Sequence, residues 1–252
     1  FFASFKSNDE IFGSIRLLPQ NFSFKYFIDG WKGSGKATYT NFFINTFLLV
    51  IPTTIFTVMS SALVAYGFAR FQFPGKKILF VLLIAMLMLP NSVVIIPRYT
   101  LYNKFNWINN PLYPALWVPS LFATETYFVY QLVQFMRNVP RDLDEAAAID
   151  GCSSFQTLYK VIVPMLMPAL VSCALFQFMW SCNDFMGPLL YVSTPGKYPM
   201  SLFVKLSMDG DTGFAWNKIL ALSLISILPQ LIVFFCAQDQ FVEGISAGAV
   251  KG

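Results

Sequence analysis

The sequence predicts an all-α protein that crosses a membrane several times. Of its 252 residues, 56% are hydrophobic and 12% are charged, and the mean hydropathy is +0.58. Soluble domains carry about 25% charged residues, so this composition is typical of a chain that lies in lipid. Several long stretches hold no charged residue, and each approaches the roughly 20 apolar residues that one membrane-spanning helix needs. These stretches are 41–69, 78–97, 105–124, 161–183 and 219–238.

We therefore expect a single transmembrane domain, 1–252, with six spans of which the first is truncated. Residues 1–5 are an apolar run that is cut, and we read them as the end of that first span. An external loop with room for one surface helix follows at 6–40. The five complete spans are then expected at 41–69, 78–97, 113–136, 164–190 and 218–239. Residues 137–163 form a loop and 240–252 a tail.

The composition excludes several classes of function. The net charge of +4 is too small and too dispersed to indicate a nucleic-acid-binding surface. The chain has no His, and its four cysteines lack the spacing of metal ligands or redox pairs. No pair of acids converges as a membrane-embedded enzyme would need. We expect no bound metal, no disulfide and no catalytic residue.

One motif imitates a phosphate-binding loop. Residues 30–37, Gly-Trp-Lys-Gly-Ser-Gly-Lys-Ala, nearly match G-x-x-x-x-G-K-[ST], but Ala37 stands where the Mg²⁺-binding hydroxyl belongs. The motif also needs a preceding buried strand, whereas here a polar loop leads into an apolar segment. We interpret the match as chance, so the chain is not itself expected to hydrolyse ATP.

The stretch 142–168 is an island of charged and small residues between apolar segments. Pro140 can occupy the first turn of a helix, and Asp142, Asp144 and Glu145 place acid near its N-terminus, where the helix dipole favours it. Leu143, Ala146 and Ala147 then share one face.

Gly151 can take the left-handed conformation that ends a helix, and Ser153 or Ser154 can cap the next one. In that second helix the apolar residues recur at i, i+3, i+4 and i+7, which predicts one stripe. They are Phe155, Leu158, Tyr159 and Ile162. Two helices this short cannot cross a bilayer, so we expect a hairpin at the membrane surface.

This stretch resembles the EAA loop of binding-protein-dependent ABC importer permeases. The resemblance rests on three pieces and their spacing: Glu-Ala-Ala at 145–147, then Gly151 after three intervening residues, then Val-Ile-Val-Pro at 161–164 after nine intervening residues. Valines replace the usual Ile and Leu at 161 and 163. Asp150-Gly151 and the tail 241–252 are similar to the carbohydrate branch, which includes the smaller permease of the maltose importer. Further similarity lies at 45–46, 65–70 and 73–75.

The resemblance implies a non-catalytic subunit of an importer for a sugar or oligosaccharide. Its partners would be a second permease, two ATPase subunits that bind ATP and Mg²⁺, and an external sugar-binding protein, in the inner membrane of a prokaryote. The implied ATPase-coupling residues are Asp144, Glu145, Ala146, Ala147, Asp150, Gly151 and Phe155. The pliant tail would contact the ATPases through Gly244, Gly248 and Lys251.

The resemblance also implies that the 137–163 loop and the C-terminus are cytoplasmic. The distribution of basic residues does not settle this, because in that topology most of the 17 Lys and Arg residues lie outside. The long first loop holds several of them.

Polar residues within the apolar segments are candidates for the cargo path, because charge in a bilayer usually faces a cavity or a partner. Glu125 is the first candidate, and the alternative is a hydrogen bond to another helix or to the partner permease. Residues 180–185, Trp-Ser-Cys-Asn-Asp-Phe, and Pro188-Leu189 resemble a segment of sugar permeases, although Cys182 replaces a frequent Trp. The other candidates are Gln131, Gln177, Trp180, Asn183 and Asp184.

Two alternatives stay open. The cargo of an ABC importer could be a solute other than a sugar. A secondary transporter or channel would need coupling-ion or filter residues at mid-membrane and no docking loop, which makes it the weaker interpretation.

Overall fold

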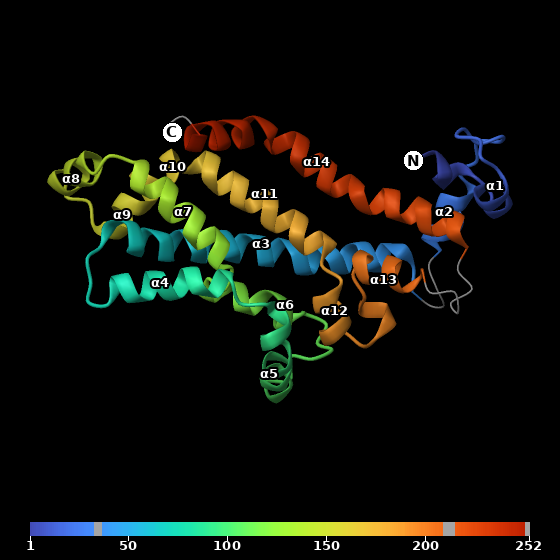
Figure 1. Cartoon of the computed structure of the whole chain (residues 1–252), viewed down its shortest axis with the longest axis horizontal. Coiled ribbons are helices and arrows are strands. Elements are labelled where there is room, and N and C mark those ends of the chain that lie inside the picture. The colour runs from blue at the N-terminus through green and yellow to red at the C-terminus, as the bar shows by residue number, and fades with distance from the viewer. Residues whose placement is uncertain (33–36, 209–214, 250–252) are drawn as a thin grey trace. The chain divides into compact units, whose positions relative to one another are not determined.

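The computed structural model describes residues 1–32, 37–208 and 215–249, with side chains up to residue 240 (Figure 1). Its regular elements in these ranges are helices. They are α1 Asn8–Gly13, α2 Lys25–Trp31, α3 Tyr39–Arg70, α4 Lys76–Leu87, α5 Asn91–Lys104, α6 Pro114–Trp117, α7 Thr126–Asn138, α8 Asp142–Ile149, α9 Ser154–Thr157, α10 Val163–Met165, α11 Met167–Asn183, α12 Met186–Tyr191, α13 Met200–Leu206 and α14 Trp216–Ala249. The 3₁₀ turns are η1 Phe2–Phe5, η2 Val118–Phe122 and η4 Pro195–Lys197, and η3 Leu158–Ile162 is a π-helix turn. The imitation phosphate-binding motif falls partly at 33–36, outside the described residues.

The chain divides into two compact units. Unit 1 contains 1–51, 99–116 and 179–233, and unit 2 contains 52–98, 117–178 and 234–252. The first boundary falls at Pro52, inside α3.

The all-α prediction is confirmed for the described residues, and the membrane spans are found in part. Two helices are long and apolar enough to cross a membrane, namely α3 and the part of α14 from Trp216 to Gln240. Two bent pairs could each be one further span: α4 with α5, which meet at 101°, and 154–165 with α11, which meet at 80°. The described residues therefore hold two to four candidate spans.

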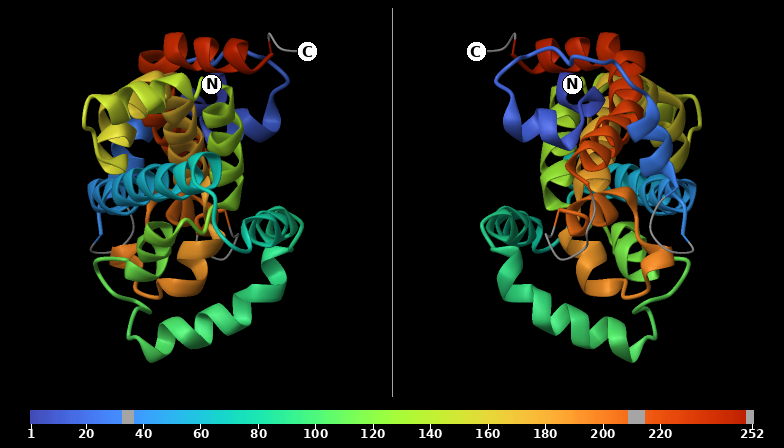
Figure 2. Two further views of the ribbon diagram at one scale, coloured as in Figure 1. Left: turned by 90° about the vertical axis from the view of Figure 1, so that its left-hand side faces the viewer. Right: turned by 90° about the vertical axis from the view of Figure 1, so that its right-hand side faces the viewer.

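The segment expected as a straight span at 78–97 is broken at Met88 to Pro90. Pro90 lacks an N–H and disfavours helical geometry at the residue before it. The last turn of α4 closes instead with 3₁₀-type bonds, from the N–H of Met88 to Ala85 O and from that of Leu89 to Met86 O. Figure 2 shows α5 turning sharply away from α4.

The segment 113–136 is also not one helix. It consists of α6, η2 and α7, with a break at 123–125 where Ala123 has a left-handed φ of 52°. The placement of Glu125 deep within a hydrophobic helix is therefore wrong, because Glu125 is the exposed N-cap residue of α7.

The expectation of a separate pliant tail is not met in the described part of the chain. Helix α14 continues as one helix to Ala249, so Gly244 and Gly248 lie one turn apart on a helical backbone. Lys251 lies outside the described residues.

Unit 2 has one apolar core built mainly from α3, α7 and α11. Helix α7 buries Phe128, Val129, Leu132, Val133 and Met136, which share one face because they follow the helical period. The core residues of α3 are Tyr66 and the alanines at 62, 65 and 69, again one face, and the alanines permit close approach. The guanidinium of Arg137 lies 4.8 Å from the centre of the Phe80 ring and joins the end of α7 to α4.

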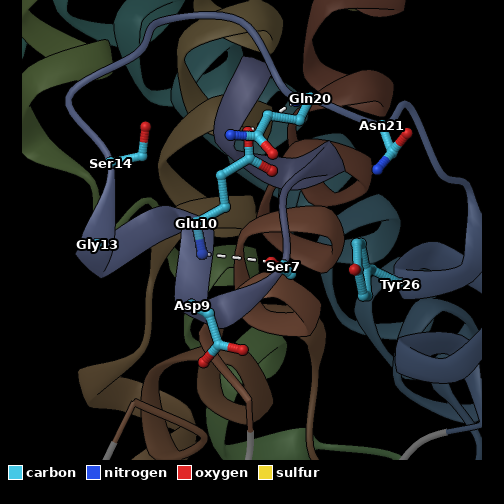
Figure 3. A pocket seen from close by; sticks show the side chains of 8 residues that line it. All are labelled: Ser7, Asp9, Glu10, Gly13, Ser14, Gln20, Asn21 and Tyr26. Carbon is cyan, nitrogen blue, oxygen red and sulfur yellow. Dashed lines mark hydrogen bonds between the residues drawn. The ribbon is translucent and has the colours of Figure 1, made fainter.

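Unit 1 packs the start of α3 against α13 and α14. The rings of Phe42 and Phe203 stack with centroids 4.1 Å apart, and Tyr39 donates to Leu222 O over 3.2 Å. At the N-terminus, a polar cavity of about 370 Å³ lies beside α1 (Figure 3). Its two internal bonds are from the N–H of Glu10 to Ser7 Oγ and from the N–H of Gln20 to Glu10 Oε1.

Candidate functional site

The hairpin formed by residues 142–162 belongs to unit 2 and begins with α8. The first turn of α8 carries Asp142, Asp144 and Glu145, as the sequence predicts, so three carboxylates lie where the helix dipole favours them. Ala147 is buried, whereas Glu145 and Ala146 are exposed. Leu143, Ala146 and Ala147 lie at i, i+3 and i+4 of α8, as predicted, and of the three Ala147 is buried and Ala146 is exposed.

The turn of the hairpin is a Schellman motif centred on Gly151. The N–H of Cys152 donates to Ala147 O over 2.9 Å, and that of Gly151 to Ala148 O over 3.1 Å. Gly151 has a φ of +79°, so its predicted left-handed conformation is confirmed. This backbone is available to glycine at little cost, and a side chain there would strain it.

Helix α9 begins with a capping box. Ser153 Oγ accepts from the N–H of Gln156 over 3.4 Å, and Gln156 Oε1 accepts from the N–H of Ser153 over 2.8 Å. This selects Ser153 from the two predicted caps. The two strong caps on either side of Cys152 fix the bend between α8 and α9 locally.

The predicted single apolar stripe of the second helix is wrong. Leu158 and Ile162 are buried, whereas Phe155 and Tyr159 are each 68% exposed. The second helix is also not α-helical throughout, because in η3 the N–H of Val163 bonds to Leu158 O, an i→i+5 spacing. This wider turn changes the angular position of successive residues, so an α-helical period no longer applies.

The exposed residues of the hairpin include large apolar side chains, acids and Lys160, and one of the acids, Glu145, also lines the cavity between the hairpin and α3. Ile149 is 87% exposed and follows Glu145 by one turn of α8. Phe155 and Tyr159 add two exposed aromatic rings. We call Glu145, Ile149, Phe155 and Tyr159 the outer patch.

The inner side of the hairpin is attached to the C-terminal end of α3, which lies beside it (Figures 1 and 2). Arg70 Nε and Asp144 Oδ2 are 3.0 Å apart, an ion pair by distance although the alignment is not that of a hydrogen bond. Arg70 also donates to Val139 O over 3.0 Å, and Tyr66 donates from its hydroxyl to Ser154 O over 3.1 Å. Arg141 approaches Ala69 O at 3.5 Å.

These contacts border a cavity of about 250 Å³ between α3 and the hairpin, to which Cys152 also contributes. Sequence reasoning did not assign any role to Arg70 or Tyr66. The available signal was a basic residue directly after a long uncharged segment, on the same side as the acid-rich loop.

Three cargo-path candidates, Gln177, Trp180 and Asn183, lie on one helix, α11, although the division into units falls within it. Glu125, Gln131 and Gln177 belong to unit 2, whereas the other three belong to unit 1. Within unit 2, Gln131 Oε1 is buried and has no hydrogen-bond partner among the described residues.

In unit 1, the two outer-end polar residues have structural partners. Asn183 donates to Gln230 Oε1 and to Met179 O, each over 2.8 Å. Asp184 Oδ1 accepts from the N–H of Gly187 over 3.0 Å at the start of α12. Trp180 is 48% exposed.

The comparisons with known proteins agree with the resemblance noted in the sequence. The alpha-glucoside transport system permease protein AglG of Rhizobium meliloti is 32% identical over 214 residues, which is 83% of this chain and 56% of that protein. The osmoprotective compounds uptake permease protein GgtD of Synechocystis is 34% identical over 220 residues, 87% of this chain and 71% of that protein.

A solved structure shares the fold. It is the crystal structure of a bacterial ABC transporter involved in the import of the acidic polysaccharide alginate, with a TM-score of 0.76 and 18% identity over 96% of this chain and 88% of the matched chain. The model of the family described as "binding-protein-dependent transport system inner membrane component" matches residues 58–244, which include the whole hairpin. The chain therefore belongs to this family of non-catalytic inner-membrane permeases.

Proposed function

We propose that this chain is the permease subunit of an ATP-driven importer that brings a sugar or oligosaccharide into a prokaryotic cell. It forms six spans, with the hairpin and the C-terminus on the cytoplasmic side of the inner membrane. A second, homologous permease completes the path, two ATPase subunits bind ATP and Mg²⁺, and an external binding protein delivers the cargo. The family match over 58–244 supports this proposal.

The outer patch is the observation that carries the proposal. Three large apolar side chains, Ile149, Phe155 and Tyr159, are each exposed on a hairpin whose bend is fixed by its own caps. Exposed apolar side chains of this size, bordered by charge, are typical of a protein-docking site. Glu145 adds a carboxylate for a basic group of the ATPase.

The proposed mechanism needs no chemistry from this chain. The ATPase dimer closes on ATP and displaces the docked hairpin, and the attached helices then change the side from which the cargo is accessible. The coupling residues are those of α8 and its turn, from Asp144 to Gly151, together with Phe155. In the C-terminal part of the chain, Gly244, Gly248 and Lys251 contact the ATPases.

Two observations favour a carbohydrate cargo: the similarity to AglG, whose name refers to alpha-glucoside transport, and the Asn183-Asp184 segment. The relative named for osmoprotective compounds keeps a second cargo class in view. The proposed path residues are Glu125, Gln131, Gln177, Trp180, Asn183 and Asp184. Uptake of a panel of labelled sugars, alpha-glucosides among them, and of labelled non-sugar solutes by the reconstituted transporter tests the class, and uptake of the non-sugar solutes alone would exclude carbohydrate.

The coupling role is tested by Glu145→Lys in the complete transporter reconstituted in proteoliposomes. Because the reversed charge repels the expected basic partner, we expect uptake to fall about tenfold or more, as for a buried interfacial charge pair that loses one member. ATP hydrolysis by the complex should continue. The readouts are uptake and hydrolysis at equal amounts of chain in the membrane.

The matched control is Asp9→Lys, which reverses an exposed acid in the first turn of α1. It makes the same change of charge at a similar helical position, and uptake should stay unchanged. Normal uptake with Glu145→Lys, or an equal loss with Asp9→Lys, would contradict a docking role for the hairpin.

A further inference from the structure

The hairpin is attached to one helix, α3, at two sequence-separated points. The first is the root of α8, where Arg70 meets both Asp144 and the carbonyl of Val139. The second is the start of α9, where the Tyr66 hydroxyl meets Ser154 O over 3.1 Å. Tyr66 and Arg70 are four residues apart, so they lie on one face of α3, one turn apart. One helical turn therefore holds both arms of the hairpin.

The Arg70 contact is of a kind that holds its geometry. The Arg70 side chain is 7% exposed and that of Asp144 is 24% exposed, so water competes weakly with the ion pair. The planar guanidinium engages a carboxylate with Nε and a carbonyl with a terminal nitrogen at the same time. A single rigid group thus fixes the position of α8 relative to α3, and lysine could not reproduce both contacts.

A nearby arginine, Arg137, is held differently. Arg137 is in the last turn of α7 and lies over the Phe80 ring of α4 at 4.8 Å. It joins α7 to α4, whereas Arg70 joins α3 to the hairpin itself. The two arginines are therefore a natural pair of test and control.

We propose that Arg70 is a positioning residue that fastens the coupling hairpin to α3, with Tyr66 as its second attachment, so that displacement of the hairpin is passed directly to α3. This inference rests on the proposed coupling function. It assigns to α3 the role of first receiver of the motion. Without the attachment, the hairpin still docks on the ATPase, and its movement is no longer transmitted fully.

The test uses Arg70→Gln, Asp144→Asn and the exchange Arg70→Asp with Asp144→Arg in the complete reconstituted transporter. Each single variant should keep the ATPase subunits attached and hydrolysing. Uptake per ATP hydrolysed should fall at least about tenfold, since loss of one partner from a largely buried ion pair is strongly unfavourable. The exchanged pair, Arg70→Asp with Asp144→Arg, should recover a substantial part of the lost uptake per ATP. Arg137→Gln, the control, should change uptake per ATP much less.

A second readout reports the attachment directly. Cys152 is partly buried and borders the cavity beneath the hairpin, whereas Cys173 and Cys182 are buried and Cys236 is exposed. In a Cys236→Ser background, Arg70→Gln should raise the rate at which a maleimide labels Cys152, and the exchanged pair should lower it again. Arg137→Gln should leave that rate unchanged.

The outcomes separate the two proposals. If the ATPases attach and Glu145→Lys uncouples, but the Arg70 variants keep normal uptake per ATP and normal Cys152 labelling, the role of Arg70 is refuted and the coupling function stands. If no ATPase attaches to the unmodified chain, the proposed function itself fails. Should Arg70→Gln not accumulate in the membrane, Arg70→Lys answers the question, because it keeps the charge and loses the second contact. Unchanged coupling in that variant overturns the inference.

Discussion

The hairpin at 142–162 and the loop segment at 191–199 both turn the chain between helices, but they are held by different means. The hairpin is shaped by bonds between near neighbours, such as those from Cys152 to Ala147 and from Gln156 to Ser153. The loop at 191–199, in unit 1, is held by residues far away in the sequence. Asn45 donates to Gly196 O and Tyr198 O, and Tyr113 donates to Lys197 O over 2.8 Å.

Asn109 is the centre of the second region. Its N–H donates to Tyr191 O over 2.7 Å, its amide nitrogen donates to Thr194 Oγ1 over 2.8 Å, and its Oδ1 accepts from the N–H of Thr194 over 3.1 Å. Lys197 in turn donates to Asn109 O over 2.5 Å. One side chain and its backbone therefore hold most of the loop.

The difference indicates what each region is built for. A hairpin whose bend is set by its own caps can keep its shape when it is displaced, although Leu158 and Ile162 anchor its C-terminal end in the unit 2 core. A loop held by distant segments keeps its shape only while those segments stay together. The first arrangement suits a moving docking element, and the second suits a fixed boundary of unit 1.

The largest expected effect that tests this contrast comes from Gly151→Pro. Proline fixes φ near −65° and removes the N–H that bonds to Ala148 O, so the turn cannot form. We expect uptake to fall about tenfold or more at equal membrane abundance, because a proline that conflicts with its site costs about 3 kcal/mol. Uptake assays on the reconstituted transporter measure it.

Gly151→Ala is a milder change at the same turn than Gly151→Pro, and Gly67→Ala is its control. A Cβ at either position meets nothing within 4 Å, and Gly151 differs by its φ of +79°. The alanine should therefore cost stability at 151 through the backbone, by about 1 kcal/mol, and none at helical position 67. Equal effects at the two sites would show that the left-handed turn does not matter.

A smaller effect on transport, and a clear one on stability, is expected from Asn109→Ala. It removes the amide that bonds Thr194 and leaves backbone N–H groups without their acceptor. We expect the free energy of unfolding to fall by about 1–3 kcal/mol, with the ATPase attachment intact. Thermal unfolding in detergent, with co-purification of the ATPase as the second readout, measures both. If Asn109→Ala lost the ATPase but kept its stability, the loop at 191–199 would be the docking element and the contrast between the two regions would be wrong.

The smallest effect is expected from Ser153→Ala, which removes one of the two bonds of the capping box. N-cap substitutions of this kind cost about 1 kcal/mol. Because the Schellman turn and the Arg70 contact remain, uptake should fall less than twofold, which is of the order that a partly compensated cap loss allows. A loss as large as that of Gly151→Pro would mean that the cap, and not the glycine, sets the bend.

The success of the sequence predictions follows the same division between features held by near neighbours and features held by distant residues. The acidic start of α8 and the left-handed Gly151 were predicted correctly, and Ser153 is one of the two predicted caps, because each depends on residues within one turn. The helix α3 was also predicted, from a long uncharged segment. These are signals that a single stretch of chain carries by itself.

The errors concern features that a local pattern does not encode. Nothing in a helical period marks the i→i+5 turn at Leu158 to Ile162, or tells that Phe155 and Tyr159 are exposed whereas Leu158 and Ile162 are buried. The break at 123–125 moved Glu125 out of a helix interior, since a left-handed alanine has no sequence signature. The partners of Arg70 and Asn109 are about 70 to 85 residues away, as the Arg70–Val139 and Asn109–Thr194 bonds show. Pairs this distant need the tertiary structure.

The π-helix turn has a consequence for how docking surfaces of this kind can diverge. A π turn is in effect an α-helix with one residue inserted, so deletion of a single residue between Leu158 and Ile162 would restore ordinary winding. Everything on the N-terminal side of the deletion, including Phe155, would then be rotated about the helix axis relative to the buried anchor at Ile162. The aromatic ring exposed on the hairpin is thus selected by chain length as well as by residue identity, and deletion of one codon could exchange it for another.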